Sequence, residues 1–240
     1  MRGRYCVVIP AFQAAGTIGA LVRRVKQEGF DVMVVDDGSR DRTAFVASEH
    51  GAFVISHLRN QGKGCALRTG FEHALRAGFD GVVTIDSDGQ HDPQEIARLV
   101  REAEFQHAGL VLGNRMANGA SMPSARRWTN TVMSAVLSAL VRQEIPDSQC
   151  GFRVIRREIL EAVPLRARRF DIESELLLGA AALRWKIISV PVRTIYQQHP
   201  SHIRPLRDGL RFVSLLLRHL AWTALRRLRR PRASPNAHDV

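Results

Sequence analysis

Residues 86–90, Asp-Ser-Asp-Gly-Gln, carry three oxygen-bearing side chains at alternate positions, directly after an apolar stretch that is typical of a strand. In extended chain, residues i, i+2 and i+4 project to one side, so Asp86, Asp88 and Gln90 can converge. Hard oxygen ligands of this kind suit Mg²⁺ or Mn²⁺ and leave positions open for phosphate oxygens. Asp92 is sufficient to cap the helix that follows, so capping does not account for the other carboxylates. We therefore predict a magnesium or manganese site here.

Two further loops carry groups suited to nucleosides or anions. Residues 36–39, Asp-Asp-Gly-Ser, place adjacent carboxylates after another apolar strand. Two interpretations are open: the carboxylates bind a ribose or a base, or the segment only forms an Asp-Gly turn before the next helix. Residues 60–64, Asn-Gln-Gly-Lys-Gly, precede a predicted helix. The glycines permit close approach of the backbone to an anion, and Lys63 supplies positive charge, although the spacing is not that of a P-loop.

The second half of the chain offers two arginines and two acids. Arg115 follows a predicted strand and Arg127 begins a predicted helix, and each can bind phosphate through a forked guanidinium or remain a solvated surface residue. Asp171 and Glu173 either face a site together or only add negative charge to the first turn of a helix. The residues alone leave both alternatives open.

The elements that must position these groups alternate between strand and helix. Apolar runs that end in loops predict strands, and apolar residues at helical spacing predict the helices between them. Such alternation implies a parallel sheet covered on both faces, with ligands at the carboxyl ends of its strands. The predicted strands are 5–9, 31–35, 52–56, 81–85 and 110–113, and the helices lie near 18–29, 41–51, 64–77 and 92–103.

The order becomes looser after Pro123. The sequence predicts a helix to about residue 141, a short strand near Phe152, a helix over 171–183 and a strand over 186–192. We therefore expect an α/β fold in which residues 1–115 form a Rossmann-like half and residues 116–203 hold the second substrate.

The C-terminal segment is basic and amphipathic. Residues 201–240 hold nine of the 35 Lys and Arg but only two of the 23 Asp and Glu, in a chain of net charge +12. Apolar residues from Leu206 to Ala224 recur at spacings of three and four, which predicts a helix over 204–230, followed by a disordered tail over 231–240. This helix either lies on an anionic membrane or packs on its own domain.

Composition excludes several classes of protein. The chain of 240 residues is 45% hydrophobic and 24% charged, which is ordinary for a globular protein and not for a disordered one. Its three cysteines form no CxxC pair, so neither a disulfide framework nor a thiolate zinc site is supported. We expect neither a signal peptide nor a transmembrane helix, and therefore a cytoplasmic protein. The basic tail has no interleaved aromatic residues, so we expect no nucleic-acid partner.

Together the motifs resemble family 2 glycosyltransferases of the dolichyl-phosphate mannose synthase and dolichyl-phosphate glucosyltransferase type. The resemblance covers about residues 5–208 in the right order. The matching segments are 7–10 (Val-Val-Ile-Pro), 34–39 (Val-Val-Asp-Asp-Gly-Ser), 60–64, 85–93 (Ile-Asp-Ser-Asp-Gly-Gln-His-Asp-Pro), 113–115 (Gly-Asn-Arg), 150–153 (Cys-Gly-Phe-Arg) and 190–196.

The resemblance implies a GT-A fold over residues 1–203 and inverting transfer of a sugar from a UDP- or GDP-sugar to a polyprenyl phosphate. The metal and diphosphate site would be Asp86, Asp88 and Gln90, and Asp171 and Glu173 match an acidic pair of the family. Arg115 and Arg127 would hold phosphate of the acceptor, and Arg115 that of the donor as well. The other donor-binding residues would be Pro10, Phe12, Asp37, Lys63, Ser87 and His202.

The sequence departs from the family pattern at two places. Gln13 and Ala14 stand where the synthases usually have Asn-Glu, and His202 stands where mannose synthases usually have a lysine. Apart from these departures, the residues leave two alternative functions open. One is transfer to a hydroxyl group with Asp171 or Glu173 as general base. The other is a metal-dependent nucleotidyltransferase.

Overall fold

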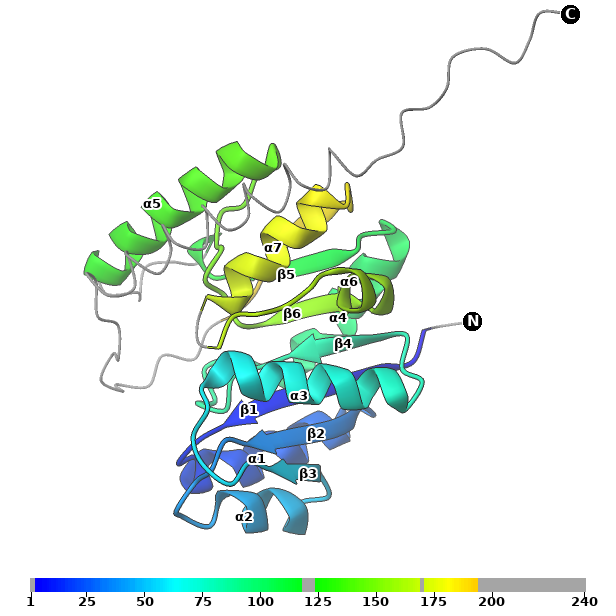
Figure 1. Ribbon diagram of the computed structural model, residues 1–240, viewed down its shortest axis with the longest axis vertical. Coiled ribbons are helices and arrows are strands. Elements are labelled where there is room, and N and C mark those ends of the chain that lie inside the picture. Colours follow the sequence, from blue (N-terminus) through cyan, green and yellow to red (C-terminus); the bar gives the residue numbers. More distant parts are fainter. Residues whose placement is uncertain (1–2, 118–123, 169–170, 194–240) are drawn as a thin grey trace, which may run out of the picture. The chain divides into compact units, whose positions relative to one another are not determined.

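A computed structural model describes residues 3–117, 124–168 and 171–193, all within the part of the chain that comprises residues 1–200. A seven-stranded sheet forms its centre (Figure 1). The strands are β1 (Tyr5–Ala11), β2 (Asp31–Asp36), β3 (Phe53–Ser56), β4 (Gly81–Thr84), β5 (Leu110–Asn114), β6 (Arg153–Arg156) and β7 (Ile187–Pro191). The helices are α1 (Ala15–Gln27), α2 (Thr43–Glu49), α3 (Lys63–Arg76), η1 (Pro93–Glu95), α4 (Ile96–Phe105), α5 (Ser124–Val141), α6 (Arg157–Ala162) and α7 (Ile172–Ala182).

The sheet is mostly parallel, as the alternation of elements predicts. Its strand order is β3-β2-β1-β4-β6-β5-β7. Every neighbouring pair is parallel except those of β6, which runs antiparallel to both β4 and β5. The apolar run near Phe152 predicts a strand but not its direction, because periodicity carries no information about the partner strand.

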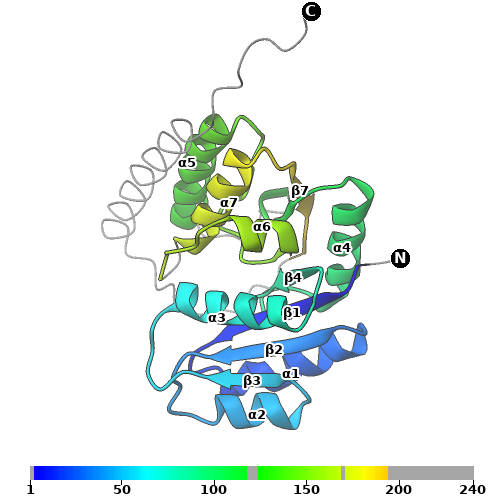
Figure 2. The ribbon, with the colours of Figure 1, turned by 45° about the vertical axis from the view of Figure 1, so that its right-hand side comes forward.

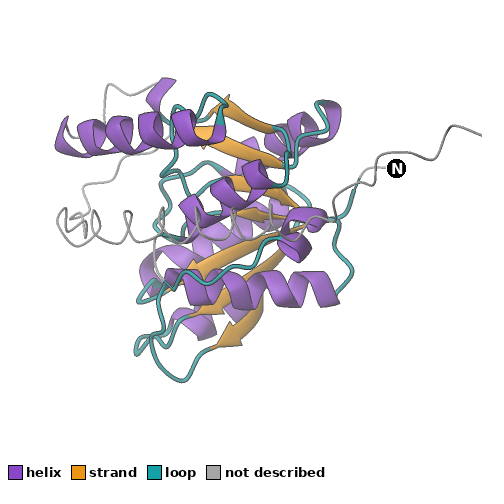
Figure 3. Cartoon of the chain, turned by 45° about the horizontal axis from the view of Figure 1, so that its top comes forward, coloured by secondary structure: helices purple, strands orange, loops and turns teal. Residues whose placement is uncertain are grey.

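Helices cover both faces of the sheet (Figure 3). Apolar residues of α1, α2 and α4, among them Ile18, Val22 and Leu99, pack in one core with side chains of β1, β2 and β4. On the other face, α3 packs on β1 and β2, and α6 lies against both α3 and α7 (Figure 2). Gly70 of α3 permits this approach, because a Cβ there would overlap the Val8 side chain.

The predicted elements agree with the structure to within a few residues at most ends. The Asp92 side chain accepts a hydrogen bond from the Gln94 N–H at 3.1 Å and caps the turn that leads into α4, as predicted. The short helix α6, which follows β6 without a loop, was not predicted. None of the helices in the described residues is long and apolar enough to cross a membrane.

Two of the sequence predictions lie outside the described residues. They are the donor-binding role of His202 and the amphipathic helix over 204–230 with the tail that follows it. Both stay predictions.

Candidate active site

The predicted site residues gather at one edge of the sheet. β1, β2, β4 and β5 all end at this edge, and the antiparallel β6 begins there, since Arg153 pairs with Thr84 and with Leu112. The chain therefore brings the loops after four strands and the loop before a fifth to the same place. This is the edge at which open α/β sheets bind ligands.

An ion-pair network with Lys63 at its centre joins two of the acids. The Lys63 Nζ lies 2.6 Å from Asp86 Oδ1 and 2.6 Å from Glu173 Oε1. Burial alone would lower the pKa of Lys63, but the two carboxylates outweigh it and raise that pKa. Burial would raise the pKa of Asp86, but the Lys63 ammonium lowers it below its usual value. Lys63 is therefore charged and bound to acids from the loop after β4 and from α7.

Asp88 lies in a different electrostatic environment from Asp86. Burial and then the negative charge of Asp86 raise the pKa of Asp88. Its Oδ1 accepts a hydrogen bond from the Gln90 N–H at 3.0 Å, and the Ser87 carbonyl between the two acids accepts one from Thr17 Oγ1 at 2.7 Å. A cation beside Asp88 would relieve this repulsion, so the pair of carboxylates is suited to one.

The donor set fits a divalent cation that shares its coordination with a ligand. Asp86, Asp88 and Gln90 offer oxygen atoms, as Mg²⁺ and Mn²⁺ prefer. Within the residues that the structure describes, no three His, Cys, Asp or Glu side chains are grouped so as to hold a metal alone. Phosphate oxygens of a bound nucleotide would complete such a site.

Two residues that were not predicted fix the Asp86 carboxylate and the α7 backbone. Gly151 packs so closely on Asp86 that a Cβ would overlap the Oδ2 atom. Arg153 is fully buried and donates to three carbonyl oxygens, those of Cys150 (2.8 Å), Ser148 (2.6 Å) and Glu173 (2.6 Å). The segment Cys-Gly-Phe-Arg was the available signal, but its spacing does not reveal these contacts.

The carboxylate of Asp37 is occupied by the loop that precedes α3. Its Oδ1 accepts from the Gln61 N–H at 2.9 Å and lies 2.8 Å from His57 Nδ1, and its Oδ2 accepts from the Gly62 N–H at 2.7 Å. The loop that ends in Lys63 is thereby held to the end of β2. The adjacent Asp36 bonds to Ser39, so residues 36–39 do form the predicted turn.

Pro10 lies near the end of β1 and Phe12 directly follows it, at the same edge of the sheet. Pro10 pairs with Val35 inside the sheet, while the Phe12 side chain is 48% exposed beyond it. An exposed aromatic ring beside a ligand edge is free to stack on a nucleoside base. The nucleoside-binding role of both residues stays a prediction.

Arg115 is oriented by a buried acid. Its Nε and Nη2 donate to the two oxygens of Asp147 at 2.7 and 2.9 Å, and Asn130 of α5 donates to the same carboxylate at 2.8 Å. Hydrogen bonds from Arg115 hold the pKa of Asp147 below its usual value, although burial acts in the opposite direction. Asp147 was not among the predicted site residues. Arg127 is exposed near the start of α5.

The acidic pair is divided between two environments. Glu173 is buried and contacts Lys63 through its Oε1 atom. Its Oε2 atom has no hydrogen-bond partner within the described residues. Asp171 immediately precedes α7 and is half-buried. Glu173 is therefore placed beside Asp86 by the ion pair that each of them makes with Lys63.

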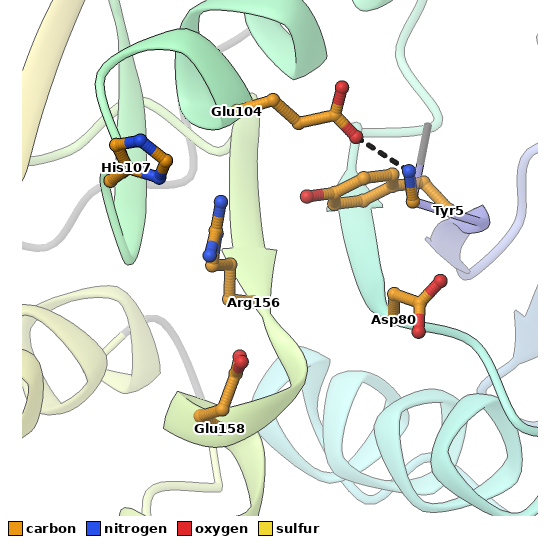
Figure 4. A pocket seen from close by; sticks show the side chains of 7 residues that line it. Tyr5, Asp80, Glu104, His107, Arg156 and Glu158 are labelled. Atoms are coloured by element: carbon orange, nitrogen blue, oxygen red, sulfur yellow. Dashed lines mark hydrogen bonds between the residues drawn. The ribbon is translucent and has the colours of Figure 1, made fainter. Parts of the chain in front are cut away.

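A cavity of about 320 Å³ lies at the opposite edge of the sheet, near the start of β1 and β4 (Figure 4). Tyr5, Asp80, Glu104 and Arg156 are among the residues that line it. Glu104 accepts a hydrogen bond from the Gly3 N–H at 2.7 Å, and Asp80 accepts one from the Arg4 N–H at 2.7 Å, so these acids fasten the start of the chain. The cavity is separate from the carboxylates at the end of β4.

Comparison with known proteins identifies relatives of the whole fold. Residues 6–163 match the family model described as Glycosyl transferase family 2. The chain is 30% identical over 216 residues to a UDP-N-acetylglucosamine–dolichyl-phosphate N-acetylglucosaminyltransferase of Methanococcus voltae, with 80% of this chain and 86% of that protein covered. It is 29% identical over 204 residues to the polyprenol monophosphomannose synthase of Mycolicibacterium smegmatis, with 79% and 76% covered.

Solved structures share the fold. A glucosyl-3-phosphoglycerate synthase from Mycobacterium tuberculosis, in complex with phosphoglyceric acid, superposes with a TM-score of 0.70 at 24% identity, with 90% of this chain and 80% of that chain covered. The same enzyme has been solved with Mn²⁺ and uridine diphosphate, at a TM-score of 0.70 and 23% identity. At this identity the likeness establishes the architecture of the sheet and its helices.

Proposed function

The chain belongs to glycosyl transferase family 2, and from this premise we propose that it transfers a sugar from a nucleoside diphosphate-sugar to a polyprenyl phosphate. In this proposal the transfer depends on a metal ion and inverts the configuration at the anomeric carbon. The names of its relatives support the acceptor class. Those relatives are named a dolichyl-phosphate N-acetylglucosaminyltransferase, a polyprenol monophosphomannose synthase and, in Micrococcus luteus, an undecaprenyl-phosphate mannosyltransferase.

The pairing of Lys63 with Asp86, beside a second carboxylate at Asp88, is the observation that carries the proposal. Cleavage of a sugar–phosphate bond builds negative charge on the departing diphosphate. A divalent cation held by Asp86 and Asp88, with Gln90 beside them, would supply Lewis-acid stabilisation of that charge when bound. Lys63 adds a fixed positive charge at the same place, already oriented by two carboxylates.

The acceptor phosphate needs orientation and not deprotonation, because it is an anion at neutral pH. Arg115 suits this task, since Asp147 fixes its guanidinium plane and limits its side-chain motion. Arg127 is the second candidate for a phosphate contact. An acceptor oxygen held there would form its bond to the anomeric carbon as the bond to the donor diphosphate breaks on the opposite face, which inverts the configuration.

The nucleotide-sugar donor would bind at the ends of β1, β2 and β4. Phe12, with Pro10 before it, would pack on the nucleoside, and Ser87 would lie beside the diphosphate. Asp37 would bind the donor from the turn after β2, where its carboxylate also holds the loop that precedes α3. His202 would contribute from the segment that follows the described residues. The donor is proposed to be a UDP- or GDP-sugar.

One observation favours a second acceptor chemistry. The Glu173 Oε2 atom is buried and has no hydrogen-bond partner in the part of the chain that the structure describes, so it could accept a proton from an attacking hydroxyl group. Glu173→Gln would then abolish transfer while the donor still binds. For a phosphate acceptor, the same variant would weaken the orientation of Lys63 and leave measurable turnover.

The test incubates the purified chain with labelled UDP- and GDP-sugars and a polyprenyl phosphate, in Mg²⁺, Mn²⁺ or EDTA. We expect a lipid-linked sugar phosphate with the metals and its loss in EDTA. Asp88→Asn should remove this product, whereas the exposed surface change Asp31→Asn should leave it. Transfer only to a hydroxyl acceptor, or release of pyrophosphate from a nucleoside triphosphate, would contradict the proposal.

A lipid acceptor places the reaction at a membrane. We propose that the protein is peripheral on the cytoplasmic face of the membrane, with the basic segment 204–230 as one contact. This role of the segment is a proposal from its sequence.

A further inference from the structure

The cavity at the opposite edge of the sheet from the proposed active site is built around a missing side chain. Tyr5 of β1 pairs with Gly81 of β4, and Gly81 pairs with Arg156 of β6, so these residues form one row across three strands. Residues directly opposite each other in neighbouring strands point to the same face of the sheet. Because the middle residue is a glycine, the side chains of Tyr5 and Arg156 flank an open position. A Cβ at Gly81 would lie 2.5 Å from an atom of the Tyr5 ring, so the ring lies against this position.

The two side chains that flank Gly81 carry hydrogen-bond donors without acceptors. Tyr5 is only 7% exposed, and Figure 4 shows its hydroxyl group pointing into the cavity on the side of Arg156. Neither this hydroxyl group nor the buried Arg156 Nε atom has a hydrogen-bond partner among the residues that the structure describes. Burial raises the pKa of Tyr5, so its hydroxyl group stays protonated and can donate. Since buried donors are unfavourable without an acceptor, the cavity suits a ligand that supplies acceptor oxygens.

Three carboxylates line the same cavity of about 320 Å³, those of Asp80, Glu104 and Glu158. Backbone N–H groups of residues 3 and 4 occupy one oxygen of Glu104 and one of Asp80. Within the described part of the chain the second oxygen of each of these acids has no partner, and Arg156 forms no ion pair with any of the three carboxylates. Opposite charges therefore line one cavity without direct contact, and the space between them can hold a ligand that contacts both.

The charge of the lining restricts the class of ligand. An anion would bind Arg156 but would be repelled by the three carboxylates. A simple cation would bind the carboxylates but offers no acceptor to Tyr5 or Arg156. A hydroxyl group both donates and accepts hydrogen bonds, so a neutral molecule with several hydroxyl groups satisfies the two kinds of group together.

We infer that this cavity binds a neutral polyhydroxy compound of the size of a mono- or disaccharide. Its hydroxyl oxygens accept from Tyr5 and Arg156, and its hydroxyl hydrogens reach the free oxygens of Glu104 and Asp80. The volume of about 320 Å³ is at the lower end of the range of ligand pockets, about 300–1,000 Å³. The inference goes beyond the proposed function, because the length of β1, about 20 Å, separates Tyr5 from the edge proposed to bind the donor.

The first experiment measures binding of glucose and trehalose to the full chain by saturation-transfer-difference NMR. Tyr5→Phe removes only a hydroxyl group that no described residue uses, so the variant should fold normally and bind about three- to tenfold more weakly. Arg156→Met should weaken binding about tenfold or more, because it removes a charged donor. The matched control Arg101→Met replaces an exposed arginine that does not line the cavity and should leave binding unchanged. No binding of either sugar up to about 50 mM, or unchanged binding in both cavity variants, would overturn the inference.

A second measurement tests the class of ligand. Gluconate is close to glucose in size but carries a carboxylate, and it should bind about tenfold more weakly because it faces the three acids of the cavity. Spermidine, a cation without acceptor oxygens, should not displace trehalose. Tighter binding of gluconate than of glucose, or displacement of trehalose by spermidine, would assign the cavity to a charged ligand and overturn the inference.

A third measurement separates the cavity from the proposed active site. Asp88→Asn should bind glucose and trehalose like the unmodified chain, and uridine diphosphate with Mn²⁺ should not displace either sugar. Loss of sugar binding in Asp88→Asn, or displacement by the nucleotide, would assign the sugar to the active site and overturn the inference. If the unmodified chain transfers no sugar to a polyprenyl phosphate, the proposed function fails, and the binding results still decide the role of the cavity.

Discussion

Replacing Lys63 with methionine tests whether its ammonium group holds the two acids of the site together. In the structure this group contacts Asp86 and Glu173 at 2.6 Å each, and only 15% of the Lys63 side chain is exposed. Removing one partner from a buried ion pair costs about 3–5 kcal/mol. Because 29% of the Asp86 side chain reaches water, we expect a value near the lower end, about 3 kcal/mol.

The destabilisation should depend on pH. In the unmodified chain the lowered pKa of Asp86 contributes stability above the usual carboxyl pKa, and this contribution is lost as the pH falls through the folded value. The raised pKa of Lys63 contributes stability that is present at all pH values below its usual pKa. Without Lys63, burial raises the pKa of Asp86. Protonation of Asp86 at low pH then relieves its repulsion with Asp88 in the folded state. The loss of stability should thus be largest at pH 8 and smaller at pH 5.

Urea unfolding followed by circular dichroism, in metal-free buffer at pH 8, 6.5 and 5, measures both effects. Lys26→Met is the matched control, because Lys26 is also helical but exposed, and it should change stability by less than about 0.5 kcal/mol at each pH. A loss below about 1 kcal/mol for Lys63→Met, or one that does not vary with pH, would refute the reasoning.

Two further predictions concern the supports of the site. Gly151→Ala should lower kcat by about 10²-fold, because the new Cβ must displace the Asp86 carboxylate. The control Gly16→Ala, with no atom near its Cβ, should leave kcat unchanged. A steady-state assay measures both, and equal kcat values for the two variants would contradict a role for the contact between Gly151 and Asp86. Asp147→Asn should raise KM for the lipid phosphate about tenfold, because Arg115 loses its charged partner. The KM for the donor should change less. An unchanged KM for the lipid phosphate would argue against the role of Asp147 in orienting Arg115.

Much of the fold was predictable from local patterns. The apolar runs of β1, β2 and β4 are continuous because both faces of these strands are covered, and this is the feature that predicts a parallel sheet. The cap at Asp92 was predictable for a similar reason, since the hydrogen bond it makes is to a backbone group only two residues away. These features depend on residues close in the chain.

The supports of the site could not be predicted in this way. Asp147 is 32 residues from Arg115 in sequence, and His57 is 20 residues from Asp37. Neither pair has a spacing that indicates contact, because the sheet order brings them together. The same holds for Lys63, whose predicted role was a positive charge for an anion and whose observed partners come from the loop after β4 and from α7.

The direction of β6 explains why these contacts escape a reading of the sequence. An antiparallel strand between β4 and β5 starts at the edge where its neighbours end, so Gly151, shortly before it, arrives beside Asp86. From the first residue of that strand, Arg153 then reaches the Glu173 carbonyl. One strand therefore fixes the acid that follows β4 and the start of α7 together, and the distance that Lys63 must span is set by a strand whose orientation no local pattern encodes.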